Sequence, residues 1–271
     1  MSSRITRRRG GTAVRLLAAL LLAPLVLAPA ALAAEGEGHG GAEQVNWQAW
    51  KANNQIGDQA SLQRGAANFA NYCAGCHSLK YMRYERMAKD LGIPDDLLRK
   101  NLLPEGTKPT DYMLAHFPQA EAQEWFGRVP PDLSLITRSK GSDYVYQFLK
   151  GFYVDETKAT KTDNLALPGA AMPAVLSELE GVKRAVFAQH AGEAGGHGGG
   201  PVVERFEQVS QGSLSPEKYD AFVRDTVNYL DYVGEPAQLE RGALGIWVVL
   251  FLLVFSGFAW LLKREYWRDV H

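Results

Sequence analysis

The chain has 271 residues, of which 46% are hydrophobic and 22% are charged. These values are typical of a folded globular protein and exclude a disordered or low-complexity chain. Residues 35–241 contain 21 basic and 28 acidic side chains, a formal net charge of about −7. This charge argues against nucleic acid as a partner and would attract a basic soluble protein, although it could also serve solubility alone.

The first 34 residues have the pattern of a secretory signal peptide. Five arginines precede an apolar run, residues 16–32, that ends in small residues. Pro24 and Pro29 interrupt this run, which favours a cleaved signal over a retained membrane anchor. We therefore expect cleavage after Ala33 or Ala34 and export of the remaining chain.

Residues 61–73 are predicted to form an amphipathic helix. Ser61 is of a favoured N-cap type, and apolar side chains follow it at helical spacing. Gly65 and Phe69, one turn apart, form a notch beside an aromatic side chain, which we call the Gly65–Phe69 notch. The helix is expected to end at Cys73.

The middle of the chain, residues 79–181, is predicted to form short helices and turns, because many prolines interrupt it. No segment alternates as the core of a sheet would. A glycine-rich loop follows at residues 186–203, which two short strands could flank.

A second amphipathic helix is predicted over residues 215–233. Ser215 and Pro216 are typical of the N-cap and the first helical position. The apolar side chains of this segment share one face, which needs a partner. We expect that partner to be the Gly65–Phe69 notch.

Residues 242–262 are predicted to form a transmembrane helix. These 21 residues carry no charge, and as a helix they would span roughly 30 Å, the thickness of the hydrocarbon core. Trp247 and Trp260 lie towards the two ends, and basic residues follow at once, which favours a membrane span over a buried core helix. The basic residues place the tail, residues 263–271, in the cytoplasm, and residues 35–241 in the periplasm.

The chain has only two cysteines, in the stretch "NYCAGCHSLK", where His77 directly follows Cys76. A thioredoxin-like dithiol would need a preceding strand and a βαβ context, and a structural zinc site would need a second pair of ligands. In a c-type haem protein both thiols form thioethers to the porphyrin and the adjacent histidine binds the iron. The spacing and the export signal therefore predict one covalent haem c on Cys73, Cys76 and His77. A simple disulfide would instead leave the protein colourless.

The residues alone leave the sixth iron ligand open. Met82 and Met87 follow His77 too closely to reach the other haem face. Met172 lies in "LALPGAAMPAVL", a stiff segment that could present a thioether, although a lone methionine is equally often a core residue. Likewise, His116 is more typical of a helix end than of a ligand. The remaining candidates are Met113, His116, Met172, His190 and His197.

Residues 47–268 resemble the cytochrome c1 family, the haem subunits of bacterial cytochrome bc1 complexes. The most specific parts are "PPDLSLITRSKGSDYVYQFLKGFYVDE" and the segment around Met172. The resemblance implies that Met172 is the distal iron ligand, that Pro130 and Pro131 pack against the haem, and that Arg138 or Lys140 meets a propionate. This chain has only two alanines between Gly169 and Met172, where some members of the family have more residues.

The resemblance also implies a fold and a function. The fold would be mostly α, a class I cytochrome c-like haem domain with inserted loops, plus one C-terminal transmembrane helix. The chain would sit in the bacterial inner membrane with cytochrome b and the Rieske iron-sulfur protein, in a dimeric complex. It would pass single electrons from the Rieske protein to a soluble cytochrome c.

Other functions remain compatible with the motif. The chain could be another anchored monohaem electron shuttle, or a haem sensor or peroxidase in which His77 is the only permanent iron ligand. Carbon monoxide separates these classes, because an open ferrous site binds it readily. No nucleophile or acid–base pair is assignable, so any enzymatic activity would belong to the complex.

Overall fold

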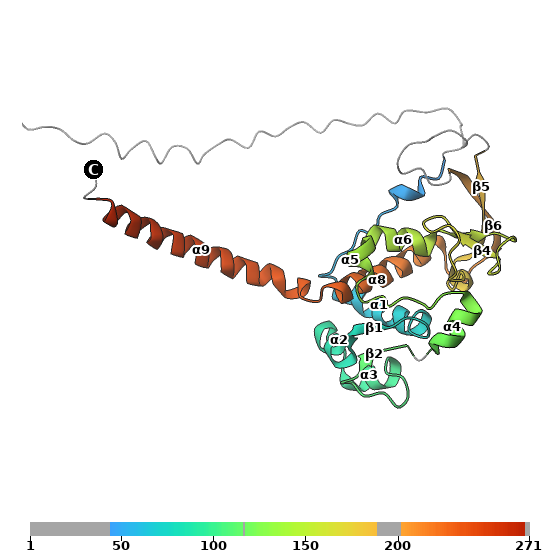
Figure 1. The fold of residues 1–271 in the computed structure, drawn as a ribbon, viewed down its shortest axis with the longest axis horizontal. Coiled ribbons are helices and arrows are strands. Elements are labelled where there is room, and N and C mark those ends of the chain that lie inside the picture. Colours follow the sequence, from blue (N-terminus) through green and yellow to red (C-terminus); the bar gives the residue numbers. More distant parts are fainter. Residues whose placement is uncertain (1–43, 116, 189–201, 269–271) are drawn as a thin grey trace, which may run out of the picture. The chain divides into compact units, whose positions relative to one another are not determined.

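The computed structural model describes residues 44–115, 117–188 and 202–268. The predicted signal peptide, residues 1–34, lies outside the described residues, as do His116, His190 and His197. After a short 3-10 helix at Trp47–Ala49, the elements are α1 (Gln59–Tyr72), β1 (Leu79–Arg83), α2 (Tyr84–Leu91), α3 (Asp95–Asn101), β2 (Tyr112–Met113), α4 (Gln119–Phe126), α5 (Ile136–Lys140), α6 (Ser142–Lys150), β3 (Phe152–Val154), β4 (Thr162–Asn164), α7 (Ser177–Glu180), β5 (Gly181–Phe187), β6 (Val203–Gln211), α8 (Pro216–Gly234) and α9 (Gln238–Tyr266) (Figure 1).

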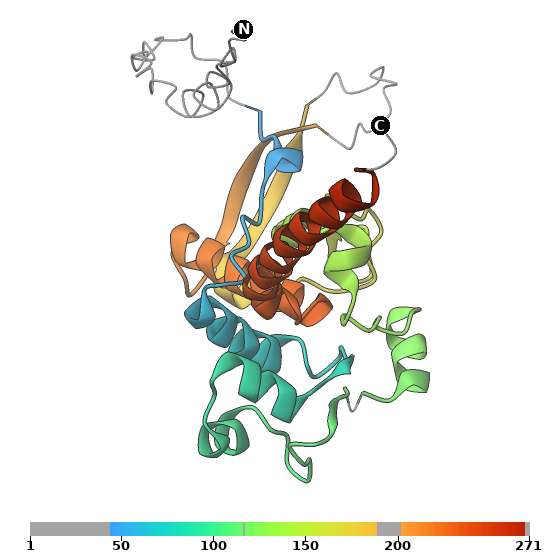
Figure 2. The same cartoon turned by 90° about the vertical axis from the view of Figure 1, so that its left-hand side faces the viewer.

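Helices make up about half of the described residues, so the mostly α class is confirmed. The strands form three separate antiparallel pairs, β1–β2, β3–β4 and β5–β6. The two strands expected around the glycine-rich loop are β5 and β6, which form a long hairpin (Figure 2). Because no pair grows into a larger sheet among the described residues, the main core is built between helices.

The Gly65–Phe69 notch packs against α8, as predicted. A Cβ atom on Gly65 would lie 2.1 Å from the backbone oxygen of Asp225 and 2.6 Å from Cβ of Tyr229. Phe69 contacts the Tyr229 ring, with 5.9 Å between the ring centroids. Only glycine permits the two helices to approach so closely, and this contact fixes the helix that leads into Cys73.

The start of α1 differs from the prediction. Its N-cap is Asp58, whose carboxylate accepts from the backbone N–H of Ser61 at 3.1 Å, so the N-cap role predicted for Ser61 is wrong. The Ser61 hydroxyl instead accepts a hydrogen bond of 3.0 Å from Asn228 on α8. A hydrogen bond to a residue distant in sequence, Asn228, thus replaces the capping bond that the local sequence predicts for Ser61. By contrast, Ser215 caps α8 as predicted, with Pro216 in the first turn.

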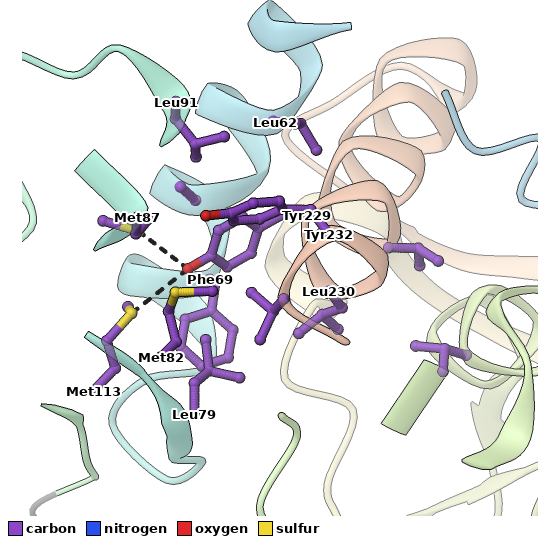
Figure 3. Close-up of a cluster of buried hydrophobic side chains, with 14 of the residues drawn as sticks. Leu62, Phe69, Leu79, Met82, Met87, Leu91, Met113, Tyr229, Leu230 and Tyr232 are labelled. Carbon is purple, nitrogen blue, oxygen red and sulfur yellow. Dashed lines mark hydrogen bonds between the residues drawn. The ribbon is translucent and has the colours of Figure 1, made fainter. Parts of the chain in front are cut away.

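Tyr229 lies at the centre of the core, and its side chain is completely buried (Figure 3). Its hydroxyl donates to the sulfur of Met87 at 3.1 Å, and the sulfur of Met113 lies 3.6 Å away. Met82 is buried in the same cluster. Met113 is therefore packed in the core, which argues against it as the sixth ligand.

Among the described residues, α9 is the one helix that is long and apolar enough to cross a membrane. It contains the whole predicted span, residues 242–262, and continues by about one turn at each end. None of its residues is buried by the rest of the chain. This exposure agrees with a membrane span and excludes a core helix.

A cluster of charged and polar side chains joins α6 to α8. Asp220 accepts hydrogen bonds from Tyr146 and Lys150 on α6 and from Arg224, whose Nε lies 2.6 Å from a carboxylate oxygen. Partial burial raises the pKa of Asp220, but the bonds from Lys150, Tyr146 and Arg224 outweigh it and lower the pKa to about 2. The ionised carboxylate therefore stabilises the folded chain.

We expect Gly65→Ala to destabilise the protein by about 1–3 kcal/mol, because the added methyl group overlaps α8. Thermal unfolding of the full chain in detergent, followed by circular dichroism, measures this loss. Gly57→Ala is the control, since a Cβ there would meet nothing within 4 Å. Equal unfolding midpoints for the two variants would contradict the close approach.

Asp220 gives a prediction for pH. Since its pKa in the folded chain lies below the ordinary value of 3.8, its contribution is complete above pH 3.8 and is lost as the pH falls towards about 2. Denaturant unfolding at a series of pH values should show this loss in the wild type. In Asp220→Asn the free energy of unfolding should change less over the same pH interval. This variant should also be less stable than the wild type at neutral pH by about 1–3 kcal/mol. Parallel pH profiles would disprove this role.

Candidate haem site

The Cys-x-x-Cys-His motif forms a tight turn at the end of α1. The backbone N–H of Cys73 donates to the oxygen of Phe69 at 2.9 Å, which continues the helix. The backbone oxygen of Cys73 then accepts from Cys76 at 3.1 Å and from His77 at 2.8 Å. These bonds bring the three predicted site residues of the motif together, whereas Met172 lies in another segment.

The two cysteines lie in different surroundings and are not bonded to each other. Cys73 packs against the core, whereas Cys76 is exposed. Burial, and to a lesser extent the neighbouring Cys76, raise the pKa of the Cys73 thiol to about 12. A thiol of such high pKa is a poor redox nucleophile at neutral pH, which argues against the dithiol alternative.

His77 is held by a backbone oxygen from another segment. Its Nδ1 lies 2.8 Å from the oxygen of Pro131. Because a carbonyl oxygen can only accept, Nδ1 must carry the hydrogen, which leaves the lone pair of Nε2 free for a metal. Burial also lowers the pKa of His77 and so favours the neutral ring, although the bond to Pro131 opposes this shift. The ring has the tautomer that an iron ligand needs, so the residues present fit a c-type haem.

The loop that carries Pro131 is fixed against β1. Asp132 accepts from the backbone N–H of Lys80 at 2.9 Å and from that of Ser134 at 3.0 Å. The backbone N–H of Leu133 donates to the oxygen of Ser78 at 2.9 Å. Sequence reasoning missed both Asp132 and the Pro131 oxygen. The Asp-x-Ser spacing in "PPDLS" was a usable signal for the first, whereas a backbone acceptor leaves no mark in the sequence.

A small cavity of about 40 Å³ lies beside the motif. It is lined by residues of the motif, of α4 and of the segments next to them, namely Cys76, Ser78, Ala115, Phe117, Ala122, Val129 and Pro130. Pro130, expected to pack against the haem, thus lines the same cavity as Cys76. Its role towards the haem stays a prediction from the resemblance.

Met172 is partly buried in an irregular segment between β4 and α7, far from the motif in sequence. A thioether that binds iron needs no hydrogen bond to the protein, so the polar contacts of the fold do not identify it. Its role as distal ligand therefore stays a prediction from the resemblance.

Arg138 and Lys140 both lie on α5 and are exposed. Lys140 is placed over the Tyr144 ring, 5.8 Å from its centre. Within the described ranges, Arg138 makes no ion pair. Its stem passes Gly234, where a Cβ atom would lie 3.3 Å from Arg138 Cγ. Arg138 is accordingly the better candidate for a propionate.

The zinc alternative finds no support in the described part of the chain. No three side chains of histidine, cysteine, aspartate or glutamate gather there to hold a metal ion. Structural zinc requires four such ligands.

Comparison with known proteins gives a consistent result. Residues 48–102 and 101–270 match the Cytochrome C1 family. Cytochrome c1 of Allochromatium vinosum is 48% identical over 232 residues, which cover 86% of this chain and 92% of that protein. The ammonia monooxygenase gamma subunit of Nitrosomonas europaea is 41% identical over 79% of this chain and 85% of that protein. Cytochrome b/c1 of Bradyrhizobium diazoefficiens is 25% identical over 79% of this chain, but only 34% of that longer protein.

A mostly helical chain with a Cys-x-x-Cys-His turn and an apolar C-terminal helix has the features of a membrane-anchored c-type cytochrome. The chain belongs to the cytochrome c1 family. Membership implies haem c as the cofactor and an electron-transfer role as a membrane-anchored subunit of a bc1 complex, in which cytochrome b is a partner.

The contacts of Asp132 give a test of the site. Asp132→Ala should lower the free energy of unfolding by about 1–3 kcal/mol, because two backbone N–H groups lose their acceptor. Asp132→Asn should lower the free energy of unfolding by less, since its amide oxygen can still accept a hydrogen bond. Thermal unfolding of the haem-loaded chain measures both, with the exposed Glu121→Ala as control. If the alanine and asparagine variants match the control, Asp132 does not hold the loop.

Proposed function

We propose that the chain carries one covalent haem c, attached through Cys73 and Cys76, with His77 and Met172 as the two iron ligands. It passes single electrons from the Rieske iron-sulfur protein to a soluble cytochrome c within a bc1 complex. The observation that carries the proposal is the bond from His77 Nδ1 to Pro131, which leaves Nε2 free as a ligand in the same turn as the two free thiols. Haem supplies a one-electron couple whose potential the axial ligands set.

The residues of the chain have separate roles in this function. Cys73 and Cys76 bind the porphyrin covalently, and the Pro131 oxygen orients His77. Met172 would be the second protein ligand of the iron, and with both ligands in place the haem would exclude gases and peroxide and would only change its oxidation state. A neutral thioether also favours ferrous iron and so raises the potential.

We further propose the placement of the chain in the membrane. Residues 1–34 are a cleaved signal peptide, residues 35–241 form the periplasmic haem domain, residues 242–262 span the inner membrane, and residues 263–271 are cytoplasmic. The apolar α9 and the basic residues after its apolar part support this orientation. The charge of about −7 on residues 35–241 suits a basic soluble acceptor. The complex itself is expected to be dimeric.

The replacement Met172→Leu tests the ligand assignment. It removes the sulfur at similar volume, so the haem should stay attached while the reduction potential falls and the ferrous iron binds carbon monoxide. Every 59 mV of lowered potential makes electron transfer from the Rieske centre about tenfold less favourable. Redox titration and carbon monoxide difference spectra of the purified complex measure both effects.

Met113→Leu is the matched control, since the Met113 sulfur lies in the core beside Tyr229. It should leave the potential and carbon monoxide binding nearly unchanged. A Met172→Leu protein with the wild-type potential and no carbon monoxide binding would show that another residue is the sixth ligand. His116 would then be the first candidate.

A further inference from the structure

The segment around Met172, residues 165–176, contains neither helix nor strand, and we call it the Met172 segment. A segment without a regular ladder of backbone bonds must satisfy its N–H groups in other ways. Two adjacent side chains at the end of β4, Asp163 and Asn164, do so here. Both are buried, with 4% and 0% of their surface exposed.

Asp163 ties the first half of the Met172 segment to β4. One carboxylate oxygen accepts from the backbone N–H of Asn164 at 2.8 Å and from that of Gly169 at 2.6 Å. The other lies 3.3 Å from the ammonium group of Lys158. Bonds from N–H groups to a buried carboxylate are stronger than those between neutral groups. Gly169 has a φ of +78°, a conformation that favours glycine, and stands three residues before Met172.

Asn164 joins the same segment to α6. Its side-chain oxygen accepts from the backbone N–H of Ala166 at 2.9 Å and of Leu167 at 3.2 Å. Its amide nitrogen donates to the backbone oxygen of Phe148 at 2.8 Å. All three bonds are made by a side chain with no contact to water, so their loss would leave buried polar groups unpaired.

These contacts also link the Met172 segment to the part of the chain that holds His77. The helix α6 directly follows α5, which itself follows the loop with the Pro131 oxygen that holds His77. Asn164 binds the end of α6, and the N–H of Leu165 donates to the oxygen of Gly151 at 3.0 Å. The Met172 segment is therefore fixed to the same run of structure that orients the proximal histidine.

We propose that Asp163 and Asn164 are positioning residues for Met172. Their side chains hold the irregular segment in the conformation in which Met172 would bind the iron. The inference rests on the proposed ligation by Met172.

The test uses the haem-loaded full chain and compares Asn164→Ala and Asp163→Ala with Asn228→Ala. Asn228 is a matched control, because it is 3% exposed and also makes three hydrogen bonds, two to Gln55 and one to Ser61. The readouts are the sulfur-to-iron charge-transfer band of the ferric protein, carbon monoxide binding by the ferrous protein, the reduction potential and the unfolding midpoint.

We expect all three alanine variants to be less stable, but only Asn164→Ala and Asp163→Ala to weaken the charge-transfer band, lower the potential and bind carbon monoxide at least tenfold faster while folded. Asp163→Asn keeps an oxygen acceptor and should restore most of the band. If one alanine variant does not fold, the other makes the same comparison with Asn228→Ala.

Two results would overturn the inference. Wild-type ligation in the folded alanine variants would show that the segment holds Met172 without these side chains. Equal changes in Asn228→Ala would show that ligation follows overall stability. Met172→Leu, measured alongside, separates this failure from that of the proposed function. If it abolishes the band while Asn164→Ala and Asp163→Ala keep it, the ligand is right and only the positioning role is wrong; if it retains the band, the ligand assignment and the positioning role both fall.

Discussion

The close packing of α1 against α8 is the contact on which the rest of the structure depends. A single glycine, Gly65, permits it, since the backbone of α8 occupies the space of a side chain. The aromatic pair Phe69 and Tyr229 then fills the interface and forms the centre of the core. Because α1 ends in the Cys-x-x-Cys-His turn, the same contact determines where the thiols and the histidine lie.

Around this helical core, the site is held by irregular loops rather than by regular elements. The oxygen of Pro131 orients His77, and Asp132 fixes that loop to β1. At the end of β4, buried carboxylate and amide oxygens bind the backbone of the first half of the Met172 segment. Helices thus build the core, while single polar groups, in the backbone at Pro131 and in the side chains at the end of β4, hold the irregular segments around it.

Much of the architecture follows from local patterns in the sequence. The cap of α8 at Ser215, the apolar length of α9 and the helix before Cys73 were each predictable, because each depends on neighbouring residues. The spacing of the motif likewise predicts Cys73, Cys76 and His77 as the haem-binding residues, and the structure brings these three together in one turn. Signals that depend on residues near in sequence are readable without a structure.

The features that sequence reasoning missed depend on distant partners. Ser61 has a suitable side chain for a cap, but Asn228 engages it and Asp58 caps the helix instead. The sequence leaves Met113 as a possible ligand, but in the structure its sulfur lies in the core, 3.6 Å from the Tyr229 hydroxyl. The Pro131 oxygen belongs to the backbone, so no residue type reveals it. Long-range contacts and backbone acceptors are the parts that a single sequence does not encode locally.

The junction between α8 and α9 limits how the haem domain can move. Three residues separate the end of α8 at Gly234 from the start of α9 at Gln238, and such a link reaches roughly 10 Å at most. An ion pair of 2.5 Å between Arg241 and Glu235 also joins this link to the first turn of α9. With α9 as the membrane anchor, a link of this length would keep the domain close to the membrane surface. In the proposed function, the redox partners would therefore have to reach the domain, because the link is too short for the domain to reach them.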